Sequence, residues 1–207
     1  ATLMQARDNS QVRDALDEAD MVCADGMPIV WMQKRLGCNH AERVYGPDVL
    51  LALCQATENT DITHYFYGGL GDVPQLMVNE LLKKFPNLSI IGSDAPPLFE
   101  IKDEPRQETI QQLNTINADI IWVGLGSPKQ DLWMSCYHPH LNSRLLICVG
   151  AAFDFIAGIK PQAPRWMQRH GLEWLFRLFS EPRRLWRRYF IYNSRFIWNV
   201  LRHSNGR

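Results

Sequence analysis

Short apolar runs that end in glycine or aspartate alternate along this chain with segments of helical periodicity. The runs have the length of strands, and the segments between them have the length and spacing of amphipathic helices. This alternation predicts an α/β fold, in which helices cover both faces of a parallel sheet. The expected strands are Met21–Ala24, His64–Tyr67, Leu88–Ile91, Ile120–Val123 and Leu145–Val149. The expected helices are Asp48–Thr57, Pro74–Phe85, Pro105–Asn117 and Lys129–Tyr137.

Glycines follow four of the expected strands, and those after three of these strands define a candidate site. In a parallel sheet the ligand lies beyond the carboxyl ends of the strands, where backbone N–H groups and helix N-termini can face an anion. Gly68 and Gly69 follow one strand, Gly124 and Gly126 follow a second, and Gly150 follows a third. We therefore expect these turns to approach a bound ligand closely.

The turn Gly124–Gln130 also carries a cation, because Lys129 stands near the start of the helix that follows. Glycines, a helix N-terminus and a lysine together suit a diphosphate. The turn matches neither the dinucleotide pattern GxGxxG nor the P-loop pattern GxxxxGK[ST], so it does not by itself identify a class of nucleotide-binding protein.

Asp25 follows the first expected strand directly, which predicts its carboxylate at the carboxyl edge of the sheet. A carboxylate in that place can act as a general base on a sugar hydroxyl, a step that contributes about 10²- to 10⁴-fold to a rate. The alternative is an N-cap for a helix that begins near Pro28. The spacing alone does not decide between the two.

Two other charged residues each have a structural and a functional interpretation. Arg43 could clamp a phosphate or pair with a nearby aspartate, and the motif alone favours the ion pair. Asp154 lies between Phe153 and Phe155, an apolar setting in which a carboxylate needs a partner. Bonds to N–H groups of its own loop are a strong alternative to a ligand.

The last part of the chain differs from the rest in charge and composition. From Arg165 onward there are ten arginines against Glu173 and Glu181, although the whole chain has 22 basic and 22 acidic residues. Segregation of this kind indicates contact with a surface or a polyanion. We expect one domain over residues 1–163 and a basic helical appendage over residues 164–207.

A long helix is expected to begin at Pro182. On a helical wheel it has an apolar stripe opposite a group of arginines, which favours a membrane surface, or docking on the domain, over a nucleic-acid groove. The stripe consists of Leu185, Tyr189, Tyr192, Phe196 and Val200, and the arginines opposite are Arg184, Arg187, Arg188, Arg195 and Arg202. Trp166 and Trp174 are expected to pack in the core.

Composition places the chain in a reducing compartment. Its five cysteines are far apart and form no CxxC pair, which argues against a disulfide framework and a zinc ribbon. There is no signal-peptide pattern and no apolar run of the roughly 18 residues that a membrane span needs. We expect a cytoplasmic protein whose first helix runs from Thr2 to Ala19.

Taken together, these segments resemble the WecG/TagA/CpsF family of bacterial glycosyltransferases. The resemblance covers nearly the whole chain and rests on six motifs that occur in order. They are Ala24–Gly26, Arg43–Asp48, Tyr67–Gly69, Gly124–Trp133, Val149–Phe155 and Gly171–Leu178.

The resemblance implies a Rossmann-like domain and an inverting hexosyltransferase of cell-surface polysaccharide biosynthesis. The donor would be a UDP-sugar that carries ManNAc, ManNAcA or glucose, and the acceptor a polyprenyl-diphosphate-linked saccharide. Asp25 would be the base, with Arg43 and Gln130 lining the substrate pocket and Asp154 near it. Arginines of the appendage would meet the diphosphates and an anionic membrane surface. They are Arg165, Arg177, Arg183, Arg184, Arg187 and Arg188.

The chain departs from the family pattern in three places. The family's first strand, with a Thr-x-Asn turn, should precede the helix at Thr2 and is absent from this sequence. Asp131 stands where glutamate is usual, and Gln162 stands where arginine is usual. The last change would remove one phosphate contact.

The sequence has no DxD motif, so we expect no metal and no cofactor, with activity that is independent of metal. We expect the protein to lie on the inner face of the cell membrane. Exposed aromatic residues on its helices would also favour a homo-oligomer. The rival interpretations are a nucleotide-dependent oxidoreductase and a polyanion-binding module.

Overall fold

The computed structural model describes residues 2–96 and 104–204, which fall into two compact units. One comprises residues 18–21 and 44–160 and is called the sheet unit; the other comprises residues 1–17, 22–43 and 161–207 and is called the helical unit. The last change of unit along the chain, after residue 160, lies close to residue 164, where the appendage is expected to start. Residues 1–17 and 22–43 fall within the expected first domain, but by their contacts they belong to the same unit as residues 161–207.

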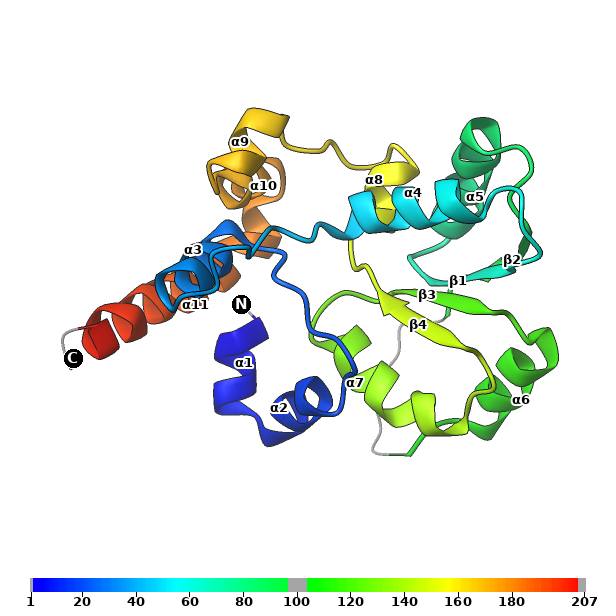
Figure 1. Ribbon diagram of the computed structural model, residues 1–207, viewed down its shortest axis with the longest axis horizontal. Helices are drawn as coiled ribbons and strands as arrows, with labels where there is room; N and C mark the ends of the chain where they lie inside the picture. Colours follow the sequence, from blue (N-terminus) through cyan, green and yellow to red (C-terminus); the bar gives the residue numbers. More distant parts are fainter. Residues whose placement is uncertain (1, 97–103, 205–207) are drawn as a thin grey trace. The chain divides into compact units, whose positions relative to one another are not determined.

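The sheet unit contains a four-stranded parallel sheet in the order β2-β1-β3-β4 (Figure 1). Its strands are β1 (His64–Gly68), β2 (Ile90–Asp94), β3 (Ile120–Gly124) and β4 (Leu145–Cys148). The chain therefore crosses from β2 over β1 to β3, so the direction of winding reverses between β1 and β3. Four of the five expected strands and the α/β fold class are confirmed.

The expected first strand is wrong. Residues 21–25 have no regular secondary structure, and Met21 and Val22 are 79% and 56% exposed. An apolar run can form a strand only where a neighbour offers backbone hydrogen bonds. The apolar composition of Met21–Ala24 was therefore not sufficient to predict a strand.

Helices cover the two faces of the sheet in separate groups (Figure 1). The upper group in that view contains α4 (Gly46–Thr57), α5 (Val73–Lys84) and α8 (Ala152–Ile156), and the lower group α6 (Gln107–Ile116) and α7 (Lys129–Tyr137). A 3₁₀ turn, His138–His140, follows α7. Pro47 and Pro74 lie in the first turns of α4 and α5, where their missing N–H groups cost nothing.

Aromatic residues fill the core on both faces of the sheet. Phe66 and Trp122 stack on one face and Phe66 meets Phe153 edge to face. On the other face Trp133 stacks between Tyr67 and Tyr137. Successive side chains of a strand point to opposite faces, so the aromatic run of β1 supplies both layers.

A buried histidine is fully hydrogen-bonded within this core. Trp122 Nε1 donates to His64 Nδ1 at 3.0 Å, which leaves the proton on Nε2, 2.8 Å from Thr57 Oγ1. His64 is 0% exposed, and burial lowers its pKa to about 4. The imidazole is therefore neutral and structural at physiological pH.

The helical unit is built from short helices and one long one. They are α1 (Thr2–Asp8), α2 (Ser10–Asp17), α3 (Met27–Arg35), α9 (Arg165–Arg169), α10 (Glu173–Ser180) and α11 (Pro182–Ser204). The single helix expected over Thr2–Ala19 is wrong, because it is interrupted at Asn9 and ends at Asp17. The Asn9 side chain accepts a hydrogen bond from the backbone N–H of Gln11, as an N-cap residue does.

The long helix α11 begins at Pro182, as expected. Its predicted apolar stripe faces inward, since Leu185 is 3% exposed and Tyr189, Tyr192, Phe196 and Val200 are half-buried. Of the helices in the described ranges, none combines the length and the apolar character that crossing a bilayer would demand.

Candidate functional site

The carboxyl ends of β1 and β3 lie side by side where the winding of the sheet reverses, which is the place where open α/β sheets bind ligands. Gly68 pairs with Gly124, and a Cβ on Gly68 would lie 2.6 Å from the Gly124 carbonyl carbon. A Cβ on Gly124 would lie 2.7 Å from the Phe153 ring. These two glycines therefore permit close packing of the strands and of α8.

The next glycine turns leave room at the same edge. Gly69 has a φ of +78° and its N–H donates to the Gly124 carbonyl at 3.0 Å. Gly126 has a φ of +76°, and a Cβ there would meet no atom of the described residues within 4 Å. Lys129 begins α7 and is exposed. The Gly124–Gln130 turn, the Lys129 cation and the N-terminus of α7 therefore lie together, as predicted.

Gln130 has the most unusual environment of the predicted residues. It is 8% exposed, and among the residues that the structure describes no donor reaches its Oε1. Gly150, with a φ of +54°, lies beside it, and a Cβ on Gly150 would be 3.5 Å from that oxygen. A buried acceptor without a donor costs free energy, about 1–3 kcal/mol, so this oxygen is suited to an N–H or O–H group of a ligand.

Asp154 has the partner that its apolar neighbours require. Its carboxylate accepts from Lys160 Nζ at 2.6 Å, and both side chains are about three-quarters buried. Its backbone oxygen accepts from the N–H groups of Ile159 and Lys160. Lys160 lies six residues away, and nothing in its local pattern pointed to the pairing.

Asp25 does not follow a strand, so the reason for expecting it at the edge of the sheet is wrong. It lies in the irregular segment before α3, and its side chain is 71% exposed. The N-cap alternative is not formed either, since Gly26 precedes α3 and makes no side-chain cap. Instead the Asp25 carboxylate accepts from Arg43 Nη2 at 3.3 Å.

Arg43 forms the ion pairs that its motif alone favoured. Besides Asp25, its Nη2 contacts Glu173 on α10 at 2.5 Å, and its Nη1 is 3.4 Å from Gln168 Oε1. Gln168 is 4% exposed, a rare burial for a glutamine. No local sequence signal predicted the roles of Gln168 and Glu173, although Glu173 lies within one of the six motifs.

The arginines expected to meet diphosphates lie mostly on the surface of the helical unit. Arg165, Arg183, Arg184 and Arg187 are exposed and Arg177 is half-buried. Arg184 pairs with Glu181 at 2.8 Å, an i,i+3 contact on the surface. The side chain of Arg188 lies outside the described part of the chain.

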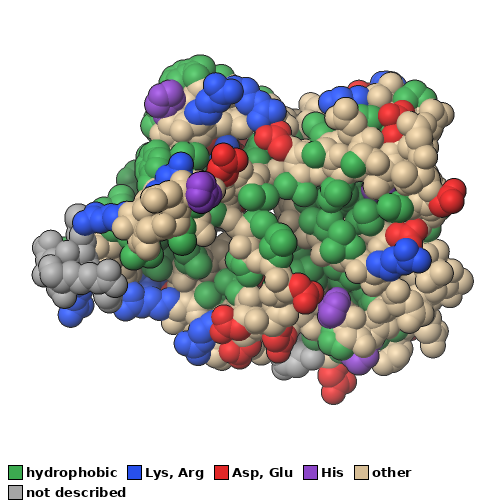
Figure 2. Space-filling view, viewed as in Figure 1, with side chains coloured by type: hydrophobic (Ala, Val, Ile, Leu, Met, Phe, Trp, Pro, Cys, Tyr) green, Lys and Arg blue, Asp and Glu red, His purple; other side chains and the backbone are tan. Residues whose placement is uncertain are grey.

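Exposed aromatic residues accompany these arginines. The Arg187 guanidinium lies 5.4 Å from the centroid of the Trp186 ring, and Figure 2 shows basic and hydrophobic side chains together at the α11 end of the helical unit. Core packing of Trp166 and Trp174 is wrong, because they are 59% and 38% exposed. Besides Trp174, the exposed large hydrophobic residues on the described parts of α10 and α11 are Phe179, Trp186, Phe190, Ile191, Ile197 and Trp198.

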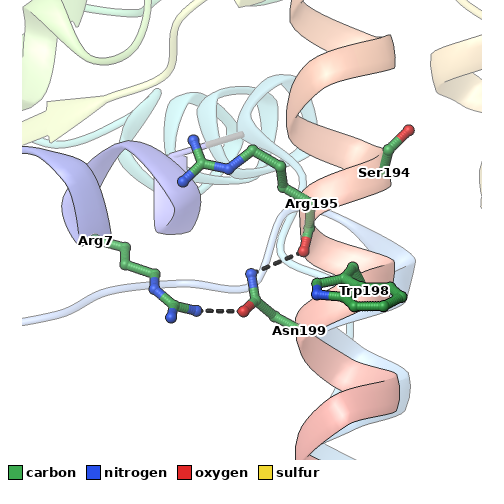
Figure 3. Close-up of a pocket in the computed structure, with 5 residues that line it drawn as sticks. All are labelled: Arg7, Ser194, Arg195, Trp198 and Asn199. Carbon is green, nitrogen blue, oxygen red and sulfur yellow. Dashed lines mark hydrogen bonds between the residues drawn. The ribbon is translucent and has the colours of Figure 1, made fainter.

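An open pocket of about 490 Å³ lies between α1 and α11 within the helical unit (Figure 3). Arg7 lines it from α1, and Arg195, Trp198 and Asn199 line it from α11 together with Ser194. Arg7 bonds to Asn199, and Arg195 holds both carboxylate oxygens of Asp8. The pocket contains none of the predicted site residues.

The described ranges contain neither a metal site nor an activated buried thiol. No three His, Cys, Asp or Glu side chains there are grouped so as to hold a metal ion. Burial raises the pKa of Cys54 to about 12. The pKa of Cys148 is also raised, mainly by burial and to a smaller extent by the charge of Asp131. Both thiols are therefore protonated at neutral pH and unsuited to nucleophilic attack.

Comparison with known proteins agrees with the motifs. The model of a family described as "Glycosyl transferase WecG/TagA/CpsF family" matches residues 1–207. A protein of Bacillus spizizenii (strain ATCC 23059 / NRRL B-14472 / W23) is 27% identical over 203 residues, which are 98% of this chain and 76% of that protein. Its name is N-acetylglucosaminyldiphosphoundecaprenol N-acetyl-beta-D-mannosaminyltransferase. Neither finding supports an oxidoreductase or a polyanion-binding module.

Proposed function

Since the chain belongs to the WecG/TagA/CpsF family and is a glycosyltransferase, we propose that it moves a hexose or N-acetylhexosamine from a UDP-sugar to a polyprenyl-diphosphate-linked saccharide. The product would serve in cell-envelope polysaccharide biosynthesis. The family match over residues 1–207 carries this proposal. The Bacillus relative, whose name specifies a mannosaminyl donor group and a lipid-diphosphate acceptor, makes ManNAc the first donor sugar to test, ahead of ManNAcA and glucose.

Asp25 is the proposed general base. Its carboxylate is exposed and bonded to Arg43, so it is held in place yet open to a substrate hydroxyl. In the proposed step it takes the hydroxyl proton of the acceptor while that oxygen bonds to the anomeric carbon of the donor. The bond from that carbon to the nucleoside diphosphate breaks, and its electron pair leaves with the diphosphate.

The edge of the sheet is the proposed donor site. The buried Gln130 Oε1 offers an acceptor for an N–H or O–H group of the donor, and the left-handed Gly126 and Gly150 let a ligand approach the backbone. The N-terminus of α7 with Lys129 can stabilise the negative charge of the leaving diphosphate.

Activity without a metal ion is part of the proposal. Helix α7, Lys129 and the arginines of the appendage are the positive groups available for the leaving charge. Transfer is expected to continue at its full rate in EDTA after the enzyme has been dialysed against the chelator. A rate that falls in EDTA and returns with Mg²⁺ or Mn²⁺ would overturn this part.

A peripheral position on the cytoplasmic face of the membrane is also proposed. It is supported by the exposed aromatic residues on α10 and α11 and by the arginines beside them. Arginines near an anionic surface add about 1 kcal/mol each, and aromatic rings prefer the interface. A lipid-linked acceptor would be met at that surface.

The decisive experiment is a transfer assay with a panel of UDP-sugars and a short-chain polyprenyl-diphosphate sugar. Asp25→Asn is expected to lower kcat by about 10²- to 10⁴-fold, because it keeps the shape of the side chain and removes the base. Asp61→Asn, which changes an exposed aspartate of the sheet unit, is the matched control and should transfer normally. Full activity of Asp25→Asn would exclude this base, and no transfer with any donor would favour a binding module.

A further inference from the structure

Arg43 is held by hydrogen bonds from each of its three guanidinium nitrogens. Nε donates to the backbone oxygen of Asp25, Nη1 faces Gln168 Oε1, and Nη2 donates to Glu173 and to the Asp25 carboxylate. All of these residues belong to the helical unit. The planar guanidinium fork is rigid, so bonds on all three nitrogens fix its orientation.

The two partners from the C-terminal helices are themselves fixed. Gln168 on α9 is buried, and its Nε2 donates to the Ala163 carbonyl at 2.8 Å, which leaves Oε1 to face Arg43. Glu173 lies in the first turn of α10, and its side chain is 16% exposed against 15% for Arg43. Removing one member of so buried a pair leaves the other charge uncompensated.

The Asp25 segment needs such support. Residues 21–25 have no regular secondary structure, so no helix or sheet ladder fixes the backbone from which the carboxylate projects. The bond from Arg43 Nε to the Asp25 carbonyl supplies a constraint at that residue. A catalytic group displaced by about 1 Å can lose about 10²-fold in rate.

We propose that Glu173 and Gln168 are positioning residues that orient Arg43, and that Arg43 in turn fixes the backbone of Asp25. The inference rests on the proposed role of Asp25 as the base. It gives Arg43 a holding role in place of the position in the substrate pocket that the family resemblance implies. It also connects helices α9 and α10 of the appendage to the segment that carries the base.

Glu173→Gln tests this proposal through the separation of kcat from KM. The change keeps the size of the side chain but weakens its hold on Arg43, so kcat should fall by about 10- to 100-fold while KM for donor and acceptor stays within threefold. Glu173→Asp, which keeps the charge, should recover part of the rate. Glu80→Gln, which removes an exposed ion pair with Lys83, is the matched control and should change neither constant.

A rise in KM for the acceptor without a fall in kcat would overturn the proposal, because it would show that Arg43 serves binding. Unchanged kcat in Glu173→Gln would overturn it as well. If Glu173→Gln does not fold, as judged by its thermal unfolding, Glu173→Asp alone provides the test with a smaller expected fall in kcat.

An NMR measurement separates this proposal from the role of Asp25. The Nε proton of Arg43 should exchange slowly with water in the unaltered protein and at least tenfold faster in Glu173→Gln, but not in Glu80→Gln. Exchange that does not respond to Glu173→Gln would overturn the holding role. If exchange responds but Asp25→Asn still transfers sugar, the base assignment has failed and the hydrogen-bond network around Arg43 stands without it.

Discussion

Aromatic side chains are used in opposite ways in the two units. Trp122 and Trp133 of the sheet unit are 0% exposed, whereas Trp186 and Trp198 on α11 are 48% and 66% exposed. Both regions are rich in aromatic residues, so aromatic content alone does not separate them. The difference shows that the sheet unit buries these rings in its own core, while α11 leaves several of its rings exposed.

The arrangement of apolar residues around α11 explains how this helix can pack inward on one side and expose aromatic rings on another. Its inward stripe is the one that contains Leu185, and a second set of apolar residues lies around the helix from it. Trp186, Phe190 and Ile197 are spaced at four and seven residues, so they share one side of the helix. An amphipathic helix of ordinary kind would carry polar residues there.

Replacing two of these exposed rings should have the largest effect. Trp186→Ser with Phe190→Ser is expected to weaken binding to vesicles with anionic lipids by at least about 100-fold, because burial of each ring is worth about 1.5–3 kcal/mol. Co-sedimentation with liposomes measures the loss. The same change should leave the free energy of unfolding in solution nearly unaltered, since both rings are exposed.

The control for that experiment is an exposed apolar residue of the sheet unit. Leu76 on α5 is 43% exposed, and Leu76→Ser should bind vesicles as the unaltered protein does. Equal binding by the double variant and the unaltered protein would show that α11 does not use this face on a membrane. The contrast between the two units would then be without functional meaning.

The buried tryptophan should give the converse result. Trp122→Phe removes the donor to His64 Nδ1 and leaves a buried acceptor unsatisfied, which should cost about 1–3 kcal/mol of unfolding free energy. Trp198→Phe, on the exposed side of α11, should stay within about 0.5 kcal/mol. Urea unfolding of the two variants provides the measurement. Equal losses would mean that the exposure difference does not govern stability.

His64 makes the stability of the sheet unit depend on pH. Its pKa is about 4 in the folded protein and about 6.5 in the unfolded chain, so below pH 6.5 the unfolded state binds the extra proton and is favoured. The contribution of His64 is complete above about pH 6.5 and is lost as the pH falls towards 4. At pH 5.5 the expected loss is about 1.4 kcal/mol. Urea unfolding at pH 7.5 and 5.5 tests this, and a His64→Gln variant should show a smaller difference.

Much of the sheet unit could be predicted from sequence because its signals are local. Strands such as Ile120–Gly124 are apolar throughout, and prolines mark the starts of α4 and α5. The Met21–Ala24 run has the same local appearance and forms no strand. Whether a run becomes a strand depends on a neighbouring strand far away in sequence, and one run does not reveal that neighbour.

The candidate site was predicted in part for the same reason. The glycine turns after β1, β3 and β4 follow from the rule that parallel strands end at one edge, and Gln130 came from the family resemblance. The partners of charged groups could not be predicted. Glu173 lies 130 residues from Arg43, and Lys160 has no pattern that selects Asp154. Ion pairs between distant residues are formed by tertiary packing, which periodicity does not encode.

The smallest expected effect concerns the C-terminal end of α6 in the sheet unit, which a single residue defines. Asn117 caps the helix with a φ of +51°, a left-handed conformation that asparagine and glycine tolerate and other residues do not. Asn117→Ala should therefore cost about 1 kcal/mol of unfolding free energy, while Asn117→Gly should cost little or nothing. Thermal or urea unfolding of the pair isolates the backbone effect, because both variants lose the same side-chain amide. An equal loss in both would assign the stabilisation to the asparagine side chain, and the end of α6 would then depend on a contact that its backbone conformation does not reveal.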